Sequence, residues 1–218
     1  MTSTEASAAG SSSSGIWNLP NILTMLRIAL VPFFVWFLVA DAPGLRSESG
    51  IWRWVAVVVF AVAIYTDKLD GDIARSRGLI TDFGKIADPI ADKLLIGSAL
   101  VMLSVLNELP WWITVVILVR EWGVTALRFF VIRYGVIPAS RGGKLKTAVQ
   151  TAAIFLYLLP LGVIAPWLEG VALAVMLVAV MITVWTGAEY VVEALKLRSQ
   201  GQRARQKETQ RPEVQEKP

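Results

Sequence analysis

Four aspartates stand where two long apolar runs approach each other along the chain. Asp67 and Asp70 follow the run WVAVVVFAVAIY, and Asp88 and Asp92 precede the run LLIGSALVMLSVL. Spacings of three and four residues place each pair on one face of a helix. Charged groups beside such apolar runs are costly in a membrane unless they face a polar cavity or a partner. The four aspartates therefore indicate one polar site between two membrane helices.

Pairing the two segments as an antiparallel hairpin arranges these side chains by depth. Ala74 and Gly84 then lie level near the turn, where small residues let helices approach closely. With a rise of about 1.5 Å per residue, the aspartates lie roughly 10–20 Å from the turn. They form two level pairs: Asp70 with Asp88, and Asp67 with Asp92.

Four ionised carboxylates this close together would repel one another. Two divalent cations about 3.5–4 Å apart would balance them. Because the chain has no His and no Cys, the ligands must be oxygens, which favours Mg²⁺ or Mn²⁺. An alternative is that Asp70 pairs with Arg75 or Lys93 and the other carboxylates face solvent, but it leaves the paired depths unexplained. Asp72 and Asp82 fall outside the pattern and are expected to be interfacial charges.

The composition is that of a helical membrane protein. The 218 residues are 55% hydrophobic and only 17% charged, and their mean hydropathy is +0.58. The apolar residues come in blocks of about twenty, the length that crosses a bilayer. Without Cys, disulfides and thiolate metal sites are excluded. We expect an all-α fold with six transmembrane helices, at about 20–40, 52–76, 84–106, 111–134, 147–166 and 170–195.

One membrane domain, residues 16–196, is expected between two tails. Residues 1–15 are small and polar, and residues 197–218 are charged without apolar periodicity. Such segments cannot bury enough apolar surface to offset the entropy of ordering, so both tails are expected to be disordered.

Basic residues predict the orientation. They flank segments 75–93 and 133–146 and follow residue 195, whereas the opposite loops contain only Arg46 and Arg53. The positive-inside rule then places both termini and the aspartates on the cytoplasmic side. We expect a multi-pass protein of a bacterial cell membrane, with its site facing the cytoplasm and lipids around its helices. No nucleic acid is expected as a partner.

The aspartates belong to a longer pattern that resembles the signature of the CDP-alcohol phosphatidyltransferase family. The match holds at all eight fixed positions, Asp67-x2-Asp70-Gly71-x2-Ala74-Arg75-x8-Gly84-x3-Asp88-x3-Asp92. The resemblance implies a six-helix membrane enzyme, forming a homodimer, in which an alcohol oxygen attacks the lipid-side phosphorus of a CDP-linked lipid and CMP leaves. It implies that two Mg²⁺ or Mn²⁺ ions are held by Asp67, Asp70 and Asp88. Asp92 would take the hydroxyl proton and also touch the metal.

The same resemblance assigns the CDP-lipid to small residues and to one arginine near the turn. A residue without a bulky side chain lets a nucleotide approach the helix backbone, and an arginine offers a fork of donors to phosphate. The residues expected to bind the CDP-lipid are Gly71, Ala74, Arg75, Thr81 and Gly84.

A second cluster of charges is expected to choose the acceptor alcohol. Arg120 lies deep in the fourth predicted helix, where an unpaired arginine would be costly, and the adjacent Glu121 is expected to face elsewhere. A phosphate monoester on the acceptor would relieve this cluster. The residues expected to bind it are Arg120, Arg128, Lys144 and Lys146. An alternative is that the two lysines only follow the positive-inside rule and do not bind a ligand.

Three readings of the activity follow. The segments REWGVTALR, GGKLKTAVQ and NLPNILTMLR resemble the branch of the family that transfers the phosphatidyl group of CDP-diacylglycerol to sn-glycerol 3-phosphate. Phosphatidylglycerol or an inositol phosphate are alternative acceptors within the family. A divalent-cation transporter is an alternative from another class, but it needs a polar path across the membrane, and the runs 54–65 and 94–106 offer none.

Overall fold

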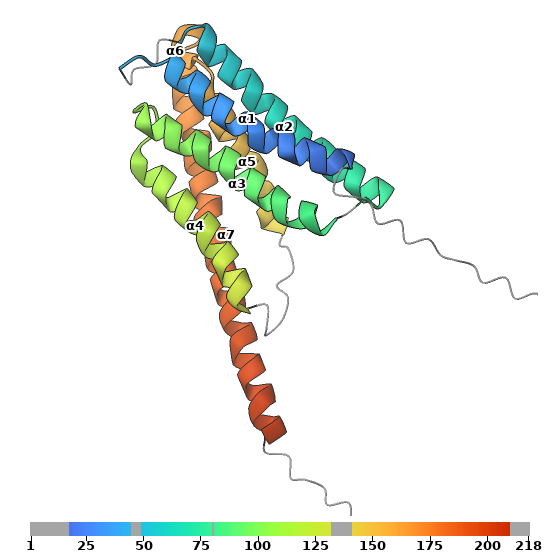
Figure 1. The fold of residues 1–218 in the computed structure, drawn as a ribbon. Coiled ribbons are helices and arrows are strands. Elements are labelled where there is room, and N and C mark those ends of the chain that lie inside the picture. The colour runs from blue at the N-terminus through green and yellow to red at the C-terminus, as the bar shows by residue number, and fades with distance from the viewer. Residues whose placement is uncertain (1–17, 45–48, 80, 132–140, 210–218) are drawn as a thin grey trace, which may run out of the picture.

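The structure, a computed structural model, describes residues 18–44, 49–79, 81–131 and 141–209. Every regular element in these ranges is a helix, which confirms the all-α expectation (Figure 1). The helices are α1 (Leu19–Ala40), α2 (Ile51–Arg77), α3 (Asp82–Val105), α4 (Trp111–Val131), α5 (Arg141–Leu158), α6 (Leu161–Ile164) and α7 (Trp167–Thr209).

The last two predicted helices differ from the structure at their ends. α5 ends at Leu158, well before the predicted end, because Pro160 lacks the backbone N–H that would continue the helix. α7 continues to Thr209, past the point where the membrane domain was expected to end. Its last turns are rich in Lys, Arg, Gln and Glu, which are good helix formers. A projecting helix therefore occupies 197–209, where a disordered tail was expected (Figure 1); residues 1–15 lie outside the described residues.

A short turn between α2 and α3 brings their polar ends together. Gly78 ends α2 in the left-handed conformation, with φ of 63°, which a glycine adopts without steric cost. The Leu79 N–H then donates to Ala74 O at 3.0 Å. Thr81 begins α3, since its hydroxyl oxygen accepts from the Gly84 N–H at 3.0 Å. α1 packs against both members of this hairpin.

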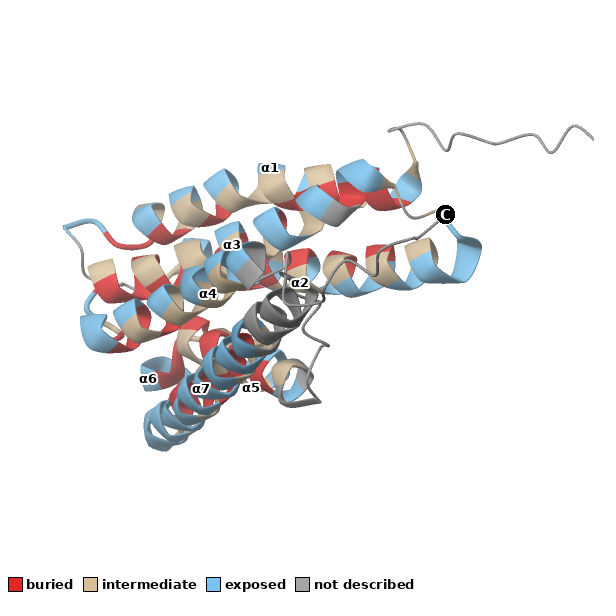
Figure 2. Cartoon of the chain, turned by 90° about the horizontal axis from the view of Figure 1, so that it is seen from below, coloured by how far each residue is buried: buried red, intermediate tan, exposed pale blue. Residues whose placement is uncertain are grey.

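The core runs along the centre of the bundle, and the outer faces are apolar too. Six long helices contribute fully buried side chains, among them Phe34, Phe60, Leu100, Ile117, Ile154 and Met176. The outward faces, pale blue in Figure 2, carry large apolar residues such as Trp36 and Trp185. Among the described residues, two helical segments are long and apolar enough to cross a membrane, Leu19–Ala40 and Trp167–Ser199.

The end of the bundle opposite the Asp-bearing turn is closed by Arg53. Arg53, which the charge pattern grouped with the loops, lies in the first turn of α2, and its side chain is buried. Its Nε donates to Leu158 O at 2.7 Å, and its guanidinium pairs with Glu108. Asp41 accepts the N–H groups of Gly50 and Arg53 at 2.8 and 3.1 Å. These bonds tie α2 to the end of α5 and to both neighbouring loops.

Candidate active site

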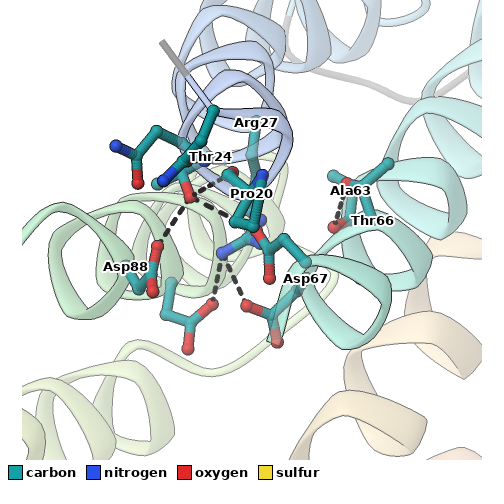
Figure 3. Close-up of polar contacts among 11 residues, drawn as sticks. Pro20, Thr24, Arg27, Ala63, Thr66, Asp67 and Asp88 are labelled. Atoms are coloured by element: carbon teal, nitrogen blue, oxygen red, sulfur yellow. Dashed lines mark hydrogen bonds and ion pairs between the residues drawn. The ribbon is translucent and has the colours of Figure 1, made fainter. Parts of the chain in front are cut away.

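The acidic cluster consists of Asp67, Asp70, Asp88 and Asp92, which α2 and α3 bring to one place. Arg27 of α1 lies among them (Figure 3), and its side chain is fully buried. Its Nη1 lies 2.6 Å from Asp67 Oδ1 and 3.2 Å from Asp92 Oδ1, and its Nη2 lies 2.6 Å from Asp70 Oδ2. Asp70 thus pairs with α1, while the alternative partner Arg75 pairs with the exposed Asp72 at 2.9 Å.

Thr24, one turn before Arg27, contacts the remaining carboxylate. Its Oγ1 donates to Asp88 Oδ1 at 2.6 Å and lies 3.3 Å from Asp70 Oδ2. The threonine hydroxyl therefore lies between the two aspartates of one predicted level pair. Arg27 Nη1 lies between the two aspartates of the other pair.

The contact of α1 with the hairpin of α2 and α3 was not predicted from the sequence. Polar residues recur at every third position in its first half, namely Asn18, Asn21, Thr24 and Arg27. The Asn18 amide donates to Leu79 O at 3.3 Å, and Asn21 Oδ1 accepts from Thr81 Oγ1 at 2.9 Å. All four therefore face the hairpin. A polar stripe on one face of an otherwise apolar helix is the signal that could have revealed it.

The residues assigned to the CDP-lipid lie around the turn. Arg75 is exposed, and its guanidinium folds over Gly71, where an added Cβ would lie 3.2 Å from its nitrogens. An added Cβ at Gly84 would lie 3.0 Å from Asn21 Oδ1. The helix that lies closest to Gly84 is therefore α1. A close approach between Gly84 and Ala74 was predicted, but Gly84 contacts Asn21 of α1 instead. Thr81 contacts the same Asn21.

The donor set of the acidic cluster fits divalent cations by its chemistry. Three of the four carboxylates contact one guanidinium, so the cluster already accommodates a cation, and its donors are the hard oxygens that Mg²⁺ and Mn²⁺ prefer. As they stand, no three acidic side chains among the described residues are arranged to hold one ion. A metal ion would therefore share these carboxylates with Arg27.

The basic cluster is built by α4, α5 and α7. Arg120 Nη1 lies 3.1 Å from Glu121 Oε1, and Lys146 Nζ pairs with the same oxygen. Arg120 Nη2 donates to Thr186 Oγ1 at 2.9 Å. The ring of Tyr190 lies 5.9 Å from the guanidinium carbon. Two cationic side chains thus share one carboxylate beside a hydroxyl and an aromatic ring.

The position of Glu121 corrects the expectation that it faces away from Arg120. Adjacent side chains leave a helix about 100° apart, but these two are long enough to meet, and Lys146 attracts the carboxylate to the same place. Gly187 makes room for the arginine, since an added Cβ there would lie 3.1 Å from Arg120 Cγ. Of the other predicted phosphate ligands, Arg128 and Lys144, the side chains lie outside the described part of the chain.

One cavity of about 1400 Å³ joins the two clusters. Its walls include Asp67 and Asp92 at the acidic end and Arg120 and Lys146 at the basic end. The Asp92 side chain is 50% exposed, in contrast to the 3% of Asp70. Pockets for single ligands typically measure about 300–1,000 Å³, so this cavity is larger than one small ligand requires.

An all-helical bundle with apolar outer faces and two charge clusters along one cavity is the architecture of a membrane protein with an internal polar site. The sequence model described as CDP-alcohol phosphatidyltransferase matches residues 17–185. The chain belongs to this family.

Three bacterial relatives are similar over most of the chain. A "Probable phosphatidylglycerophosphate synthase" of Mycobacterium tuberculosis (strain ATCC 25618 / H37Rv) is 53% identical over 181 residues, covering 83% of each chain. A "CDP-diacylglycerol--glycerol-3-phosphate 3-phosphatidyltransferase" of Bacillus subtilis (strain 168) is 38% identical, covering 80% of this chain and 94% of the relative. A protein of the same name from Rickettsia bellii (strain RML369-C) is 36% identical, covering 79% and 93%.

Proposed function

We propose that the protein transfers the phosphatidyl group of CDP-diacylglycerol to sn-glycerol 3-phosphate and releases CMP, a step of phospholipid biosynthesis. The observation that carries this proposal is the shared cavity. Carboxylates suited to metal ions line one end of it, and cations suited to a phosphate line the other. The names of the relatives, which specify this donor and this acceptor, support the choice of substrates.

The six long helices, α1 to α5 and α7, are the proposed transmembrane helices. The length and apolarity of α1 and α7 support this arrangement, as do the apolar outward faces of the bundle. By the positive-inside rule, both termini and the cavity face the cytoplasm of a bacterial cell. The membrane domain is residues 16–196, and its exposed apolar faces would also serve a homodimer.

In the acidic cluster, two Mg²⁺ or Mn²⁺ ions would be held by Asp67, Asp70, Asp88 and Asp92. When bound, such ions neutralise phosphate oxygens and stabilise the departing phosphate. The protein's own contribution is orientation. Arg27 holds three of the carboxylates and Thr24 holds the fourth, so the oxygen donors are fixed before any ligand arrives.

Asp92 is the proposed base for the acceptor hydroxyl. Its carboxylate lines the cavity and is half exposed, so a small alcohol can reach it. The hydroxyl proton moves to this carboxylate while the hydroxyl oxygen bonds to the lipid-side phosphorus. The bond from that phosphorus to the bridging oxygen breaks, and CMP leaves. The residues proposed to hold the CDP portion are Gly71, Ala74, Arg75, Thr81 and Gly84.

The basic cluster is the proposed site for the acceptor phosphate. Arg120 and Lys146 already share a carboxylate, and a phosphate monoester offers the same kind of charge-assisted contacts with more oxygens. Arg128 and Lys144 are proposed to add further positive charge. Phosphatidylglycerol, whose only phosphate is a diester, matches this cluster less well.

An acceptor screen on the purified protein tests the proposal. We expect CMP release from CDP-diacylglycerol only when sn-glycerol 3-phosphate and Mg²⁺ or Mn²⁺ are both present. Inositol phosphate and phosphatidylglycerol are the comparison acceptors. Productive use of inositol phosphate alone would overturn the acceptor assignment. If no alcohol gave CMP, and sealed vesicles carrying the protein admitted Mn²⁺, the transport reading would replace the transferase.

A further inference from the structure

Gln150 on α5 is a buried polar residue that the proposed chemistry does not use. The residue is 3% exposed, and it lines the cavity. Among the described residues, its Oε1 has no hydrogen-bond partner. Buried amide oxygens are rarely left unpaired, because the group loses its water without gaining a replacement. A buried amide left unpaired in the wall of a cavity is typical of a position that contacts a polar ligand.

The position of Gln150 relative to Lys146 sets the kind of ligand group that would reach it. The two residues are four apart on α5, so they lie on one face with their Cβ atoms about 5–6 Å apart, and both line the cavity. A phosphate held by Lys146 and Arg120 would therefore bring the next atoms of a short acceptor past Gln150. In sn-glycerol 3-phosphate, the carbon next to the phosphate-bearing carbon carries the middle hydroxyl.

We propose that Gln150 accepts a hydrogen bond from the middle hydroxyl of sn-glycerol 3-phosphate and is a specificity-determining residue for the acceptor; this inference rests on the proposed function. The phosphate at one end of the acceptor meets the basic cluster. The reacting hydroxyl at the other end meets Asp92. Gln150 contacts the only polar group of the acceptor that neither cluster takes.

A neutral amide suits this position better than a charged group would. A hydroxyl can donate and accept, so it can pair with either end of the glutamine amide. A carboxylate here would lie one turn from Lys146 and would repel the acceptor phosphate. A glutamine can therefore recognise the hydroxyl without weakening the attraction of Arg120 and Lys146 for the phosphate.

The test pairs a variant with a substrate analogue. Propane-1,3-diol monophosphate keeps the phosphate and a reacting hydroxyl but lacks the middle hydroxyl. For the wild-type protein, we expect kcat/KM to be on the order of 10–100-fold lower with the analogue, because the amide is left unpaired. Gln150→Met keeps the length of the side chain without its polar atoms. It should lower kcat/KM for glycerol 3-phosphate to the value measured with the analogue. The kcat/KM for the analogue and the KM for CDP-diacylglycerol should stay unchanged.

Thr183 supplies a matched control. It is fully buried on α7, its Oγ1 also has no partner among the described residues, and it is not part of the cavity wall. Thr183→Val should keep the wild-type ratio between the two acceptors, and melting temperatures of both variants check their folding. If Gln150→Met kept that ratio, or lowered kcat/KM equally for both acceptors, the inference would be wrong. If the wild-type protein did not use glycerol 3-phosphate at all, the proposed function would fail and the inference with it.

Discussion

At the acidic end of the cavity, the guanidinium of Arg27 contacts three of four clustered carboxylates, whereas at the basic end Arg120 and Lys146 share the carboxylate of Glu121. Both ends therefore contain an internal counter-ion. The charge balance differs, because the first cluster contains one guanidinium and four carboxylates, whereas the second contains two cations and one carboxylate. The acidic end still needs strong external positive charge, while a single anionic group suffices at the basic end.

The two counter-ions also differ in how they are held. Arg27 comes from a separate helix and is fully buried among the groups it neutralises. Glu121 is adjacent in sequence to one of its partners, and its side chain is 21% exposed. Exchange of a buried guanidinium would require movement of α1, whereas a carboxylate at the cavity wall can rotate away. We therefore expect the acidic end to keep its counter-ion during turnover and the basic end to exchange it for the acceptor phosphate.

Asp70→Asn gives the strongest test of the acidic end. It removes the most buried carboxylate of the cluster, which contacts both Arg27 and Thr24. Because several kcal/mol of charge stabilisation depend on metal ligands, we expect CMP release to fall on the order of 10³-fold or more. The measurement is CMP release at saturating substrates, with size-exclusion chromatography to check folding. Asp72→Asn, on the exposed side of α2, is the control and should retain activity. Activity retained by Asp70→Asn would contradict the metal-ligand assignment.

Arg27→Met tests whether the internal counter-ion and the metal ions serve the same carboxylates. Removing one partner of a buried ion pair costs about 3–5 kcal/mol, because the other charge is left unpaired. We expect that loss in the free energy of unfolding when EDTA is present. Saturating Mn²⁺ should recover much of it, since a bound cation replaces the missing positive charge. An equal loss with and without Mn²⁺ would indicate that Arg27 acts independently of a metal site.

The acidic end could be predicted from the sequence because it is local. Asp67 and Asp92 are joined by one tight turn, so helical periodicity is enough to bring them together. Thr24 and Arg27 could not be predicted in this way, because they are far from the aspartates along the chain. Their contacts with the aspartates arise only from the packing of α1. Helix periodicity also predicted α2, α3 and α4 to within a few residues. Helix periodicity could not predict that α7 extends to Thr209, because the last residues of this helix are polar and show no apolar periodicity.

The basic end was predicted only in part because it is assembled from distant helices. Arg120 and Lys146 are conspicuous as charges in apolar surroundings, but the loop between them says nothing of their spacing. Thr186 and Tyr190 contact Arg120 from a helix more than sixty positions away. No rule of sequence spacing relates positions so far apart. The residues that orient Arg120 could therefore be identified only from the structure.

Arg120→Met tests the basic end by affinity. The variant keeps the apolar stem of the side chain and removes the charge that would meet the acceptor phosphate. Hydrogen bonds to charged groups contribute about 1.5–3 kcal/mol, so we expect the KM for sn-glycerol 3-phosphate to rise roughly 10–100-fold. The KM for CDP-diacylglycerol should change little, because that substrate is assigned to the acidic end. A similar rise in both KM values would show that the two ends do not act on separate substrates.

Gly187→Ala is the mildest of these changes to the basic end, since it replaces no charged residue. The added Cβ would lie 3.1 Å from Arg120 Cγ, so the arginine stem must shift by a few tenths of an ångström. Because affinity for a phosphate depends on precise placement of the guanidinium, we expect roughly a 3–10-fold rise in the KM for sn-glycerol 3-phosphate. Gly123→Ala is the matched control on α4, where an added Cβ meets no atom within 4 Å. If both alanines raised this KM equally, the effect would lie in helix flexibility, and the contact between α7 and Arg120 would not position the acceptor site.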